Sequence, residues 1–320
     1  MATNFNESQQ AYRLEFHGKG SEYFAIMIVN WLLIVFTFGL YYPWARAKQL
    51  RYIYGQTSLN QERFHFSGTG KEMFRGFIMV VLFYIAVLCV YFAIMVGFES
   101  PLWAILFIYL AIFSVIPFAI HGSLRYRLSR TTYRGIRFGY RGDRMELTKM
   151  YFKDLFLTVI TLGIYGAWFQ VNIRRYTHEN MRFGEVEFSN DAKGFDYFVM
   201  NLKGYLLSII TLGIYIFWWQ RDMFEFYINH MKLSKGDQKI NYKSTATGGG
   251  FFKLQIVNIL IVAFTFGFGI AWVEMRNQKF ICDNILMDGD IDLAALSQTE
   301  QEYKDATGED AADFLDIDVM

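Results

Sequence analysis

One eight-residue pattern occurs four times in the chain and constrains its fold more than any other feature. It reads Thr, then Phe or Leu, then Gly and an apolar residue, and it ends on Trp. The copies are residues 37–44 (TFGLYYPW), 161–168 (TLGIYGAW), 211–218 (TLGIYIFW) and 265–272 (TFGFGIAW). Each copy follows a strongly apolar run and precedes polar or charged residues. A pattern repeated at intervals predicts a fold built from repeated units.

A second pattern, apolar–x–aromatic–x–small, precedes each apolar run. It occurs at residues 14–18, 64–68, 138–142, 186–190 and 240–244. Strict alternation that ends in a turn residue predicts a short strand with one apolar face. The signature Thr follows the strand start after 23, 23, 25 and 25 residues in units one, three, four and five. This nearly fixed offset predicts one duplicated unit.

The predicted domain organisation follows from these patterns. Residues 12–285 form a single membrane domain, between an N-terminal tail at residues 1–11 and an acidic C-terminal tail at residues 286–320. The five units cover about residues 12–62, 63–135, 136–184, 185–237 and 238–285.

Composition and two long apolar runs predict an integral membrane protein. The chain is 53% hydrophobic and 19% aromatic, and residues 76–98 and 102–120 carry no charge. Each run is close to the roughly 20 apolar residues that cross a bilayer. The alternative is a buried core hairpin, which we consider less consistent with this composition. The polar N-terminus has no apolar stretch, so no cleavable signal peptide is expected.

Strand, apolar helix, T-[LF]-G-[IL]-Y-x-x-W and a basic helix together resemble the YjgN-like family of bacterial inner-membrane proteins, domain of unknown function number 898. The resemblance covers essentially residues 12–285. It implies a multi-pass protein of the cytoplasmic membrane, and it brings no established activity, substrate or catalytic residue. The last copy of the signature departs from the pattern, with Gly269 in place of Tyr.

Two interpretations of the signature segments stay open. In one, each is a single 22-residue helix, slightly kinked, that crosses the bilayer. In the other, which we favour, Thr-x-Gly is the tip of a re-entrant helical hairpin, since a Gly costs about 1 kcal/mol inside a helix. Re-entrant segments would leave every Lys- and Arg-rich gap, and all five strands, on the cytoplasmic side.

The charge distribution gives an expected orientation. From Asp283 onward there are twelve acidic residues against Lys304, and the rest of the chain carries thirty basic and eighteen acidic residues. The positive-inside rule predicts residues 98–101 outside the cell and the C-terminal tail in the cytoplasm.

Polar residues recur seven positions before each signature Thr, where the sequence has Asn30, Asp154, Gly204 and Asn258. They line a shared pathway in one interpretation and join neighbouring helices by hydrogen bonds in the other. The predicted pathway or helix-break residues are Asn30, Thr37, Gly39, Asp154, Thr161, Gly163, Thr211, Gly213, Asn258, Thr265 and Gly267.

Residues around the end of each signature are expected at the membrane surface. The predicted interfacial aromatic residues are Trp44, Trp168, Trp218 and Trp272. The predicted contacts to anionic lipid headgroups are Arg46, Arg51, Arg174, Arg175 and Arg276, with ordinary topology determination as the alternative role.

Catalytic motifs are absent from the sequence. No H-E-x-x-H, G-x-S-x-G or P-loop pattern occurs, and Cys89 and Cys282 have no motif spacing. We therefore expect no enzymatic activity, cofactor, metal site or nucleic-acid partner, and the oligomeric state is not predicted.

The predicted fold is an α-helical multi-pass membrane protein with a small membrane-proximal β-sheet. The first functional hypothesis is a small-solute transporter or channel, because repeated broken helices commonly build solute pathways. The second is a non-transporting membrane scaffold that binds anionic lipid or an envelope partner.

Overall fold

The computed structural model describes residues 10–98, 101–293 and 295–299. These residues form five consecutive units, each with the order strand, helix, helix, strand. The elements are β1 (Gln10–Phe16), α1 (Gly20–Phe36), α2 (Tyr42–Gln56), β2 (Thr57–Leu59); β3 (Glu62–Phe66), α3 (Gly70–Phe98), α4 (Pro101–Arg130), β4 (Thr131–Tyr133); β5 (Ile136–Tyr140), α5 (Arg144–Ile160), α6 (Gly166–Glu179), β6 (Met181–Phe183); β7 (Val186–Asn190), α7 (Gly194–Ile210), α8 (Ile216–Asn229), β8 (Met231–Lys235); β9 (Gln238–Ser244), α9 (Gly248–Phe264), α10 (Ile270–Asp283) and β10 (Ile285–Gly289).

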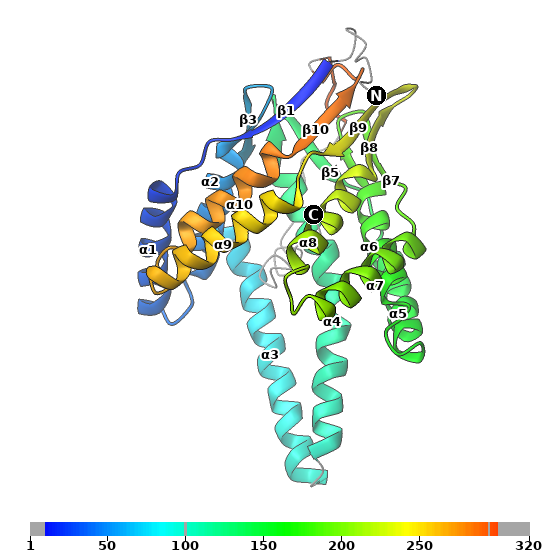
Figure 1. Ribbon diagram of the computed structural model, residues 1–320. Coiled ribbons are helices and arrows are strands. Elements are labelled where there is room, and N and C mark those ends of the chain that lie inside the picture. The colour runs from blue at the N-terminus through cyan, green and yellow to red at the C-terminus, as the bar shows by residue number, and fades with distance from the viewer. Residues whose placement is uncertain (1–9, 99–100, 294, 300–320) are drawn as a thin grey trace.

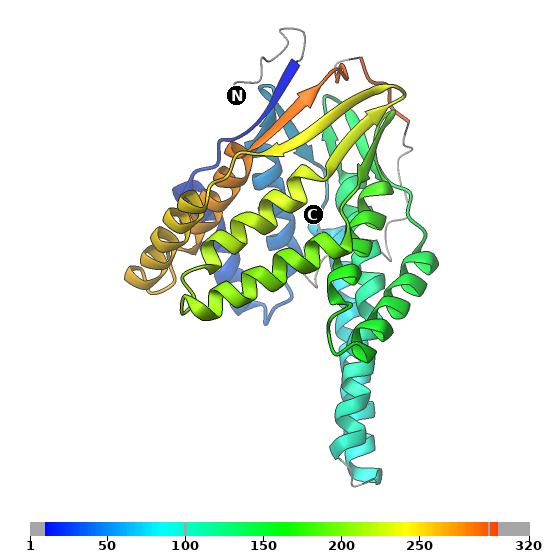
Figure 2. The same ribbon diagram turned by 45° about the vertical axis from the view of Figure 1, so that its right-hand side comes forward.

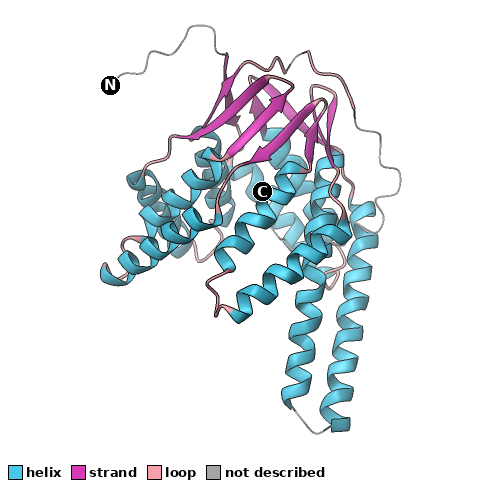
Figure 3. Cartoon of the chain, turned by 90° about the vertical axis from the view of Figure 1, so that its right-hand side faces the viewer, coloured by secondary structure: helices cyan, strands magenta, loops and turns pink. Residues whose placement is uncertain are grey.

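The ten strands close into one antiparallel barrel in which each strand pairs with its two neighbours in the chain. The two strands of a unit pair with each other, as Leu14 of β1 does with Leu59 of β2. The barrel closes where Tyr12 of β1 lies opposite Met287 of β10. All strands of the barrel therefore lie at one end of the molecule, as Figure 3 shows.

The interior of the barrel is filled by apolar side chains. Its buried residues are Tyr12, Leu59, Tyr133, Ile136, Phe183, Val186, Leu233, Ile240, Ile285 and Met287, joined by Ile291, Leu293 and Leu296 from the segment after β10. That segment is tied to the barrel, because the Tyr12 hydroxyl donates to the Ile291 carbonyl and Thr299 Oγ1 donates to the Gly184 carbonyl.

The helices all extend from one end of the barrel (Figures 1 and 2). Each helix contacts the helix before and after it, and α10 contacts α1, so the ten helices form a closed ring. Four of the hairpins are short, whereas α3 and α4 extend far beyond the others in both views.

The predicted fold class is wrong. The strands close into a ten-stranded barrel, which replaces the small sheet beside an all-helical bundle. Among the described residues, two helices have the length and hydropathy needed to cross a bilayer, within residues 70–97 and 101–130. The apolar helices α1 and α9 have 17 residues each, about 25 Å, and the chain after them returns to the barrel.

The second strand of each unit was not predicted from the sequence. β2, β4 and β6 have three residues each, too few for an alternating pattern to be recognised. β10 lies largely in residues 286–320, which the sequence assigned to an acidic tail. The acidic composition predicted a tail, but Asp288 occupies a partly exposed strand position between the buried residues Met287 and Gly289.

Candidate membrane-inserting surface

Each signature forms the tip of a short hairpin, and its Thr bonds to both helices. Thr37 Oγ1 donates to the Leu33 carbonyl at 2.7 Å and accepts from the Tyr41 N–H at 3.0 Å. The first contact is a second bond to a carbonyl that already accepts from the Thr37 N–H, and the second satisfies an N–H at the start of α2. Thr161, Thr211 and Thr265 make the same pair of bonds.

The two residues after the Thr reverse the chain. Phe38 has φ 50° and Gly39 has φ 90°, and the Gly39 N–H donates to the Ile34 carbonyl at 2.8 Å. The same left-handed pair recurs at Leu162–Gly163, Leu212–Gly213 and Phe266–Gly267. The Gly is required because it adopts this φ without the steric cost that a Cβ imposes. The alternative of one continuous 22-residue helix is therefore wrong.

The residue between Thr and Gly is a large apolar side chain in open surroundings. Phe38, Leu162, Leu212 and Phe266 are 98%, 93%, 94% and 93% exposed. A bulky residue with positive φ is uncommon, and large apolar side chains exposed to this extent are unfavourable in water. These four side chains, with their exposed apolar neighbours, form what we call the tip surface. They were not predicted as functional residues, although they occupy one fixed position of the signature.

The predicted polar residues lie between the two arms of their own hairpins. Asp154, fully buried, accepts from Asn172 Nδ2 at 2.7 Å. Asn258 Nδ2 donates to Asn277 Oδ1 at 2.7 Å, and Asn30 Nδ2 donates to the Ala45 carbonyl at 3.4 Å. Each contact joins a first helix to the second helix of the same unit. This arrangement is the one expected of interhelical hydrogen bonds.

Each signature Trp packs against the first residue of the next unit's first helix. A Cβ added at Gly70, Gly194, Gly248 or Gly20 would lie 2.5, 2.3, 2.3 or 2.2 Å from Cδ1 of Trp44, Trp168, Trp218 or Trp272. The Trp272–Gly20 contact joins the last unit to the first. Unit two has no signature Trp, and α5, which follows it, begins with Arg144 in place of Gly. The Trp side chains remain partly exposed, with Trp272 at 39%.

The predicted lipid-contacting arginines mostly contact the protein itself. Arg51 Nη2 donates to the Gly68 carbonyl at 3.1 Å, and Arg175 donates to the Ala192 carbonyl, each in the linker between the first strand and the first helix of the next unit. Arg276 Nε donates to Asn258 Oδ1 at 3.1 Å. Arg174 lies 3.7 Å above the Tyr227 ring, and Arg46 is partly buried on α2. Arg51 also lines a cavity of the first hairpin.

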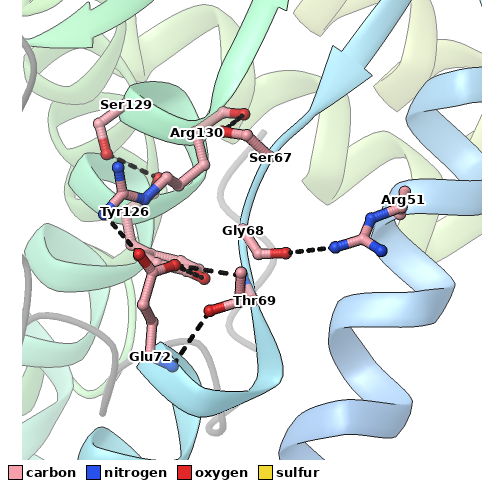
Figure 4. Close-up of polar contacts among 8 residues, drawn as sticks. All are labelled: Arg51, Ser67, Gly68, Thr69, Glu72, Tyr126, Ser129 and Arg130. Atoms are coloured by element: carbon pink, nitrogen blue, oxygen red, sulfur yellow. Dashed lines mark hydrogen bonds and ion pairs between the residues drawn. The ribbon is translucent and has the colours of Figure 1, made fainter.

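A polar junction joins the barrel to the start of α3 (Figure 4). Thr69 and Glu72 form a capping box, since the Glu72 N–H donates to Thr69 Oγ1 and the Thr69 N–H donates to Glu72 Oε2. Arg130, at the end of α4, donates to Glu72 Oε1 at 2.9 Å. The Tyr126 hydroxyl lies 3.5 Å from Glu72 Oε2. The two ends of the long hairpin are thus bonded at its base.

The same Tyr–Glu contact recurs at the base of two short hairpins. The Tyr52 hydroxyl donates to Glu22 at 3.1 Å, and the Tyr176 hydroxyl donates to Glu146 at 3.1 Å. Hydrogen bonds from Lys19 and Tyr52 lower the pKa of Glu22, and burial raises the pKa of Tyr176 to about 12. These residues were not predicted from the sequence. The Thr-x-x-Glu spacing at residues 69–72 is the signal that could have revealed the first of them.

Apolar tips beside two helices long enough to cross a bilayer define an integral membrane protein. The chain belongs to the family described as bacterial protein of unknown function, DUF898, whose sequence profile matches residues 11–203 and 218–314. The resemblance noted from the signature is thereby confirmed.

Relatives of the chain carry the name Inner membrane protein YjgN. The protein of Salmonella typhimurium is 28% identical over 172 residues, which cover 50% of this chain and 42% of that protein. The protein of Escherichia coli K12 is 35% identical over 141 residues, 44% of this chain and 34% of that protein. The chain thus aligns with less than half of either relative. No solved structure matches. The relatives support an inner-membrane location for this chain.

Proposed function

We propose that the protein is a non-catalytic, non-transporting scaffold of the bacterial inner membrane that binds anionic lipid. In this proposal α3 and α4 cross the bilayer, and the four short hairpins enter only the leaflet that faces the barrel. The tip surface carries the proposal, because four apolar side chains more than nine-tenths exposed need a non-aqueous environment.

The lengths of the exposed apolar stretches in α1 and α3 support half-insertion of the first hairpin. Exposed large apolar residues begin at Val29 in α1 and at Met79 in α3, each nine residues after the first residue of the helix. From Val29 to the tip at Phe38 is nine residues, about 13 Å, and from Met79 to Val96 is 17 residues, about 26 Å. A hydrocarbon core is about 30 Å thick. If both stretches begin at one membrane surface, α1 ends near the bilayer centre and α3 nearly crosses it.

The charges on the barrel support a cytoplasmic position for it. Arg13, Arg63, Lys239 and Lys243 alternate with the inward-facing residues of their strands. Under the positive-inside rule we expect the barrel and residues 286–299 to lie in the cytoplasm. The turn at residues 98–101 is then outside the cell, although residues 99–100 lie outside the described residues, as do residues 300–320 of the tail.

A small-solute transporter or channel is the second candidate, and the closed ring of ten helices is the feature that favours it. We prefer the scaffold for two reasons. The barrel interior is filled by side chains. The polar residues of the predicted pathway are hydrogen-bonded within separate hairpins.

The test of half-insertion is the depth of each tip in the bilayer. An environment-sensitive fluorophore would be attached to a single cysteine at Phe38, Leu162, Leu212 or Phe266, in protein lacking the native cysteines and reconstituted in vesicles carrying chain-labelled quencher lipids. A separate variant that keeps Cys89 as its single cysteine supplies the reference for the bilayer centre. Cys89 lies ten residues after Met79, about 15 Å farther from the barrel along α3.

We expect all four tips to be quenched from the depth at which Cys89 is quenched. A probe at Glu15 on the barrel should not be quenched. Tips that behave like Glu15 would contradict insertion, and tips quenched from the far surface would contradict half-insertion. A cysteine at Asn258 separates the two candidate functions, because a water-filled pathway would make it reactive toward a membrane-impermeant thiol reagent and a scaffold would not.

A further inference from the structure

An open groove lies between the two arms of the first hairpin, near the barrel. Its volume is about 340 Å³, and it is lined by Ile26, Lys48, Arg51, Tyr52, Gly55 and Gln56. The lining combines two cations, hydrogen-bonding groups and one aliphatic side chain. We call it the α1–α2 groove.

Both cations of the groove keep hydrogen-bond donors for a ligand. Lys48 Nζ donates to the Tyr41 hydroxyl at 2.7 Å, and Arg51 donates one bond to the Gly68 carbonyl. An ammonium group has three donors and a guanidinium group has five. Neither side chain forms an ion pair with a described residue. The nearby carboxylate of Glu22 is bonded to Tyr52 and is itself paired with Lys19 at 3.1 Å.

The other short hairpins lack this combination at the matching positions. Counted back from the second strand of the unit, the positions of Lys48, Arg51 and Gly55 are occupied by Asn172, Arg175 and Glu179 in unit three, Asp222, Glu225 and Asn229 in unit four, and Arg276, Lys279 and Asp283 in unit five. In unit five, Arg276 is bonded to Asn258 and Lys279 is paired with Asp283. The first unit thus presents two cations beside a glycine.

The groove lies at the height of lipid headgroups if the tips are inserted as proposed. Ile26 is three residues, about 4.5 Å, on the barrel side of Val29. Lys48 and Arg51 are four and seven residues beyond Trp44, about 6 Å and 10 Å toward the barrel. The polar layer of a bilayer occupies roughly 5–8 Å on each side of the hydrocarbon.

We infer that the α1–α2 groove binds the phosphate group of an anionic phospholipid, with Lys48 and Arg51 as the cationic contacts and Ile26 beside the glycerol region. This inference rests on the proposed scaffold and names one lipid site within it. A phosphate oxygen accepts hydrogen bonds from both cations, as charge-assisted contacts require. The space beside Gly55 is open, because a Cβ built at this position meets no atom within 4 Å. A larger side chain there would extend into the groove.

Photocrosslinking tests the inference on the full chain in vesicles of phosphatidylcholine with a minor share of phosphatidylglycerol. A photoreactive residue would replace Ile26, and in the matched control it would replace Met200. Both positions lie eleven residues before their signature Thr, but the control hairpin carries Asp222 and Glu225 where the groove has Lys48 and Arg51.

We expect the probe at Ile26 to capture phosphatidylglycerol well above its share of the bilayer and the probe at Met200 to show no such enrichment. Lys48→Gln should lower the enrichment by about fivefold, the contribution expected of one basic residue beside an anionic leaflet. Gly55→Glu should abolish it. This variant should fold, because Glu179 occupies the matching position in unit three.

Equal enrichment at both probes, or enrichment that survives Gly55→Glu, would overturn the lipid site. Binding of inorganic phosphate that Lys48→Gln weakens, without enrichment of phosphatidylglycerol at Ile26, would also overturn it and would assign the groove to free phosphate. The depth of a fluorophore at Phe38 separates this outcome from failure of the scaffold. An unchanged tip depth without lipid enrichment rejects the groove alone, and a tip in water rejects the proposed insertion.

Discussion

At the scale of single residues, the signature ends one helix and starts the next. The four signature Thr hydroxyls each bond a carbonyl before the turn and an N–H after it. In a bilayer an unsatisfied backbone group costs several kcal/mol. The Thr therefore allows the chain to turn where water does not reach the backbone.

Thr161→Val should destabilise the hairpin of α5 and α6 by about 1–2 kcal/mol, the usual cost of losing a capping side chain. Val keeps the branched shape but loses both hydrogen bonds. Thr158→Val is the matched control, because Thr158 Oγ1 makes only a back-bond to the Asp154 carbonyl. The measurement is the apparent Tm of each variant in detergent, followed by tryptophan fluorescence. Equal losses of stability in the two variants would mean that the pair of hydrogen bonds made by the Thr161 hydroxyl has no special role.

The sequence could locate these residues but not assign all their contacts. Thr161 and Gly163 recur at a fixed spacing, so repetition alone marked them as a helix break. Asp154 and Asn258 were recognised as equivalent, yet a helix position does not reveal which neighbour a side chain meets. The structure places both inside their own hairpins. The positive φ of Leu162 has no sequence signal, because Leu rarely adopts it.

At the scale of secondary-structure elements, neighbouring units are joined by the packing of Trp on Gly. Trp218 of α8 lies against Gly248 at the start of α9, and the same pairing joins the other units that carry a signature to their successors. The exception is informative, because α5 begins with Arg144 and follows the unit that has no signature Trp. From the sequence the Trp was predicted only as an interfacial residue, and its partner Gly was not recognised, since the two are separated by 26 to 30 residues in three pairs and by 252 in the pair of Trp272 and Gly20.

Gly248→Ala should weaken the contact between α8 and α9. An added Cβ would lie 2.3 Å from Trp218 Cδ1, so the indole ring or the helix must move. We expect a loss of about 1–3 kcal/mol, as for an overpacked core. The adjacent Gly249→Ala is the control, because a Cβ there meets no atom within 4 Å. That variant should be neutral or stabilising by up to about 1 kcal/mol, since Ala is the better helix former. The measurement is the apparent Tm of each variant. A decrease in Tm for Gly249→Ala as large as that for Gly248→Ala would contradict the prediction.

At the scale of the whole molecule, barrel closure sets the topology, and closure was not readable from the sequence. The five first strands alternate clearly and were predicted. Three of the five second strands have only three residues, and the seam pairs β1 with β10, near opposite ends of the described chain. No local pattern encodes such a contact. The mistaken fold class, an α-helical membrane protein with only a small β-sheet, followed from this, because five strands without recognised partners suggested a minor sheet.

Closure makes a strict prediction about membrane sidedness, because paired strands cannot be divided between two sides of a bilayer. Single cysteines at Glu15, His65, Glu187 and Asn241, each exposed on a different strand, should all be labelled from the cytoplasm in cells lacking the native cysteines. A cysteine at Leu102, which is 70% exposed at the start of α4, should be labelled from outside.

The combined labelling pattern separates the barrel from its orientation. Strand cysteines that all react from outside, with Leu102 reacting from the cytoplasm, would keep the barrel and reverse the orientation argued from the basic residues. A cysteine at Phe38 should react from neither side, because the tip is expected near the bilayer centre. Strand cysteines divided between the two sides would be incompatible with the pairing of β1 to β2 and β10, and hence with the closed barrel itself.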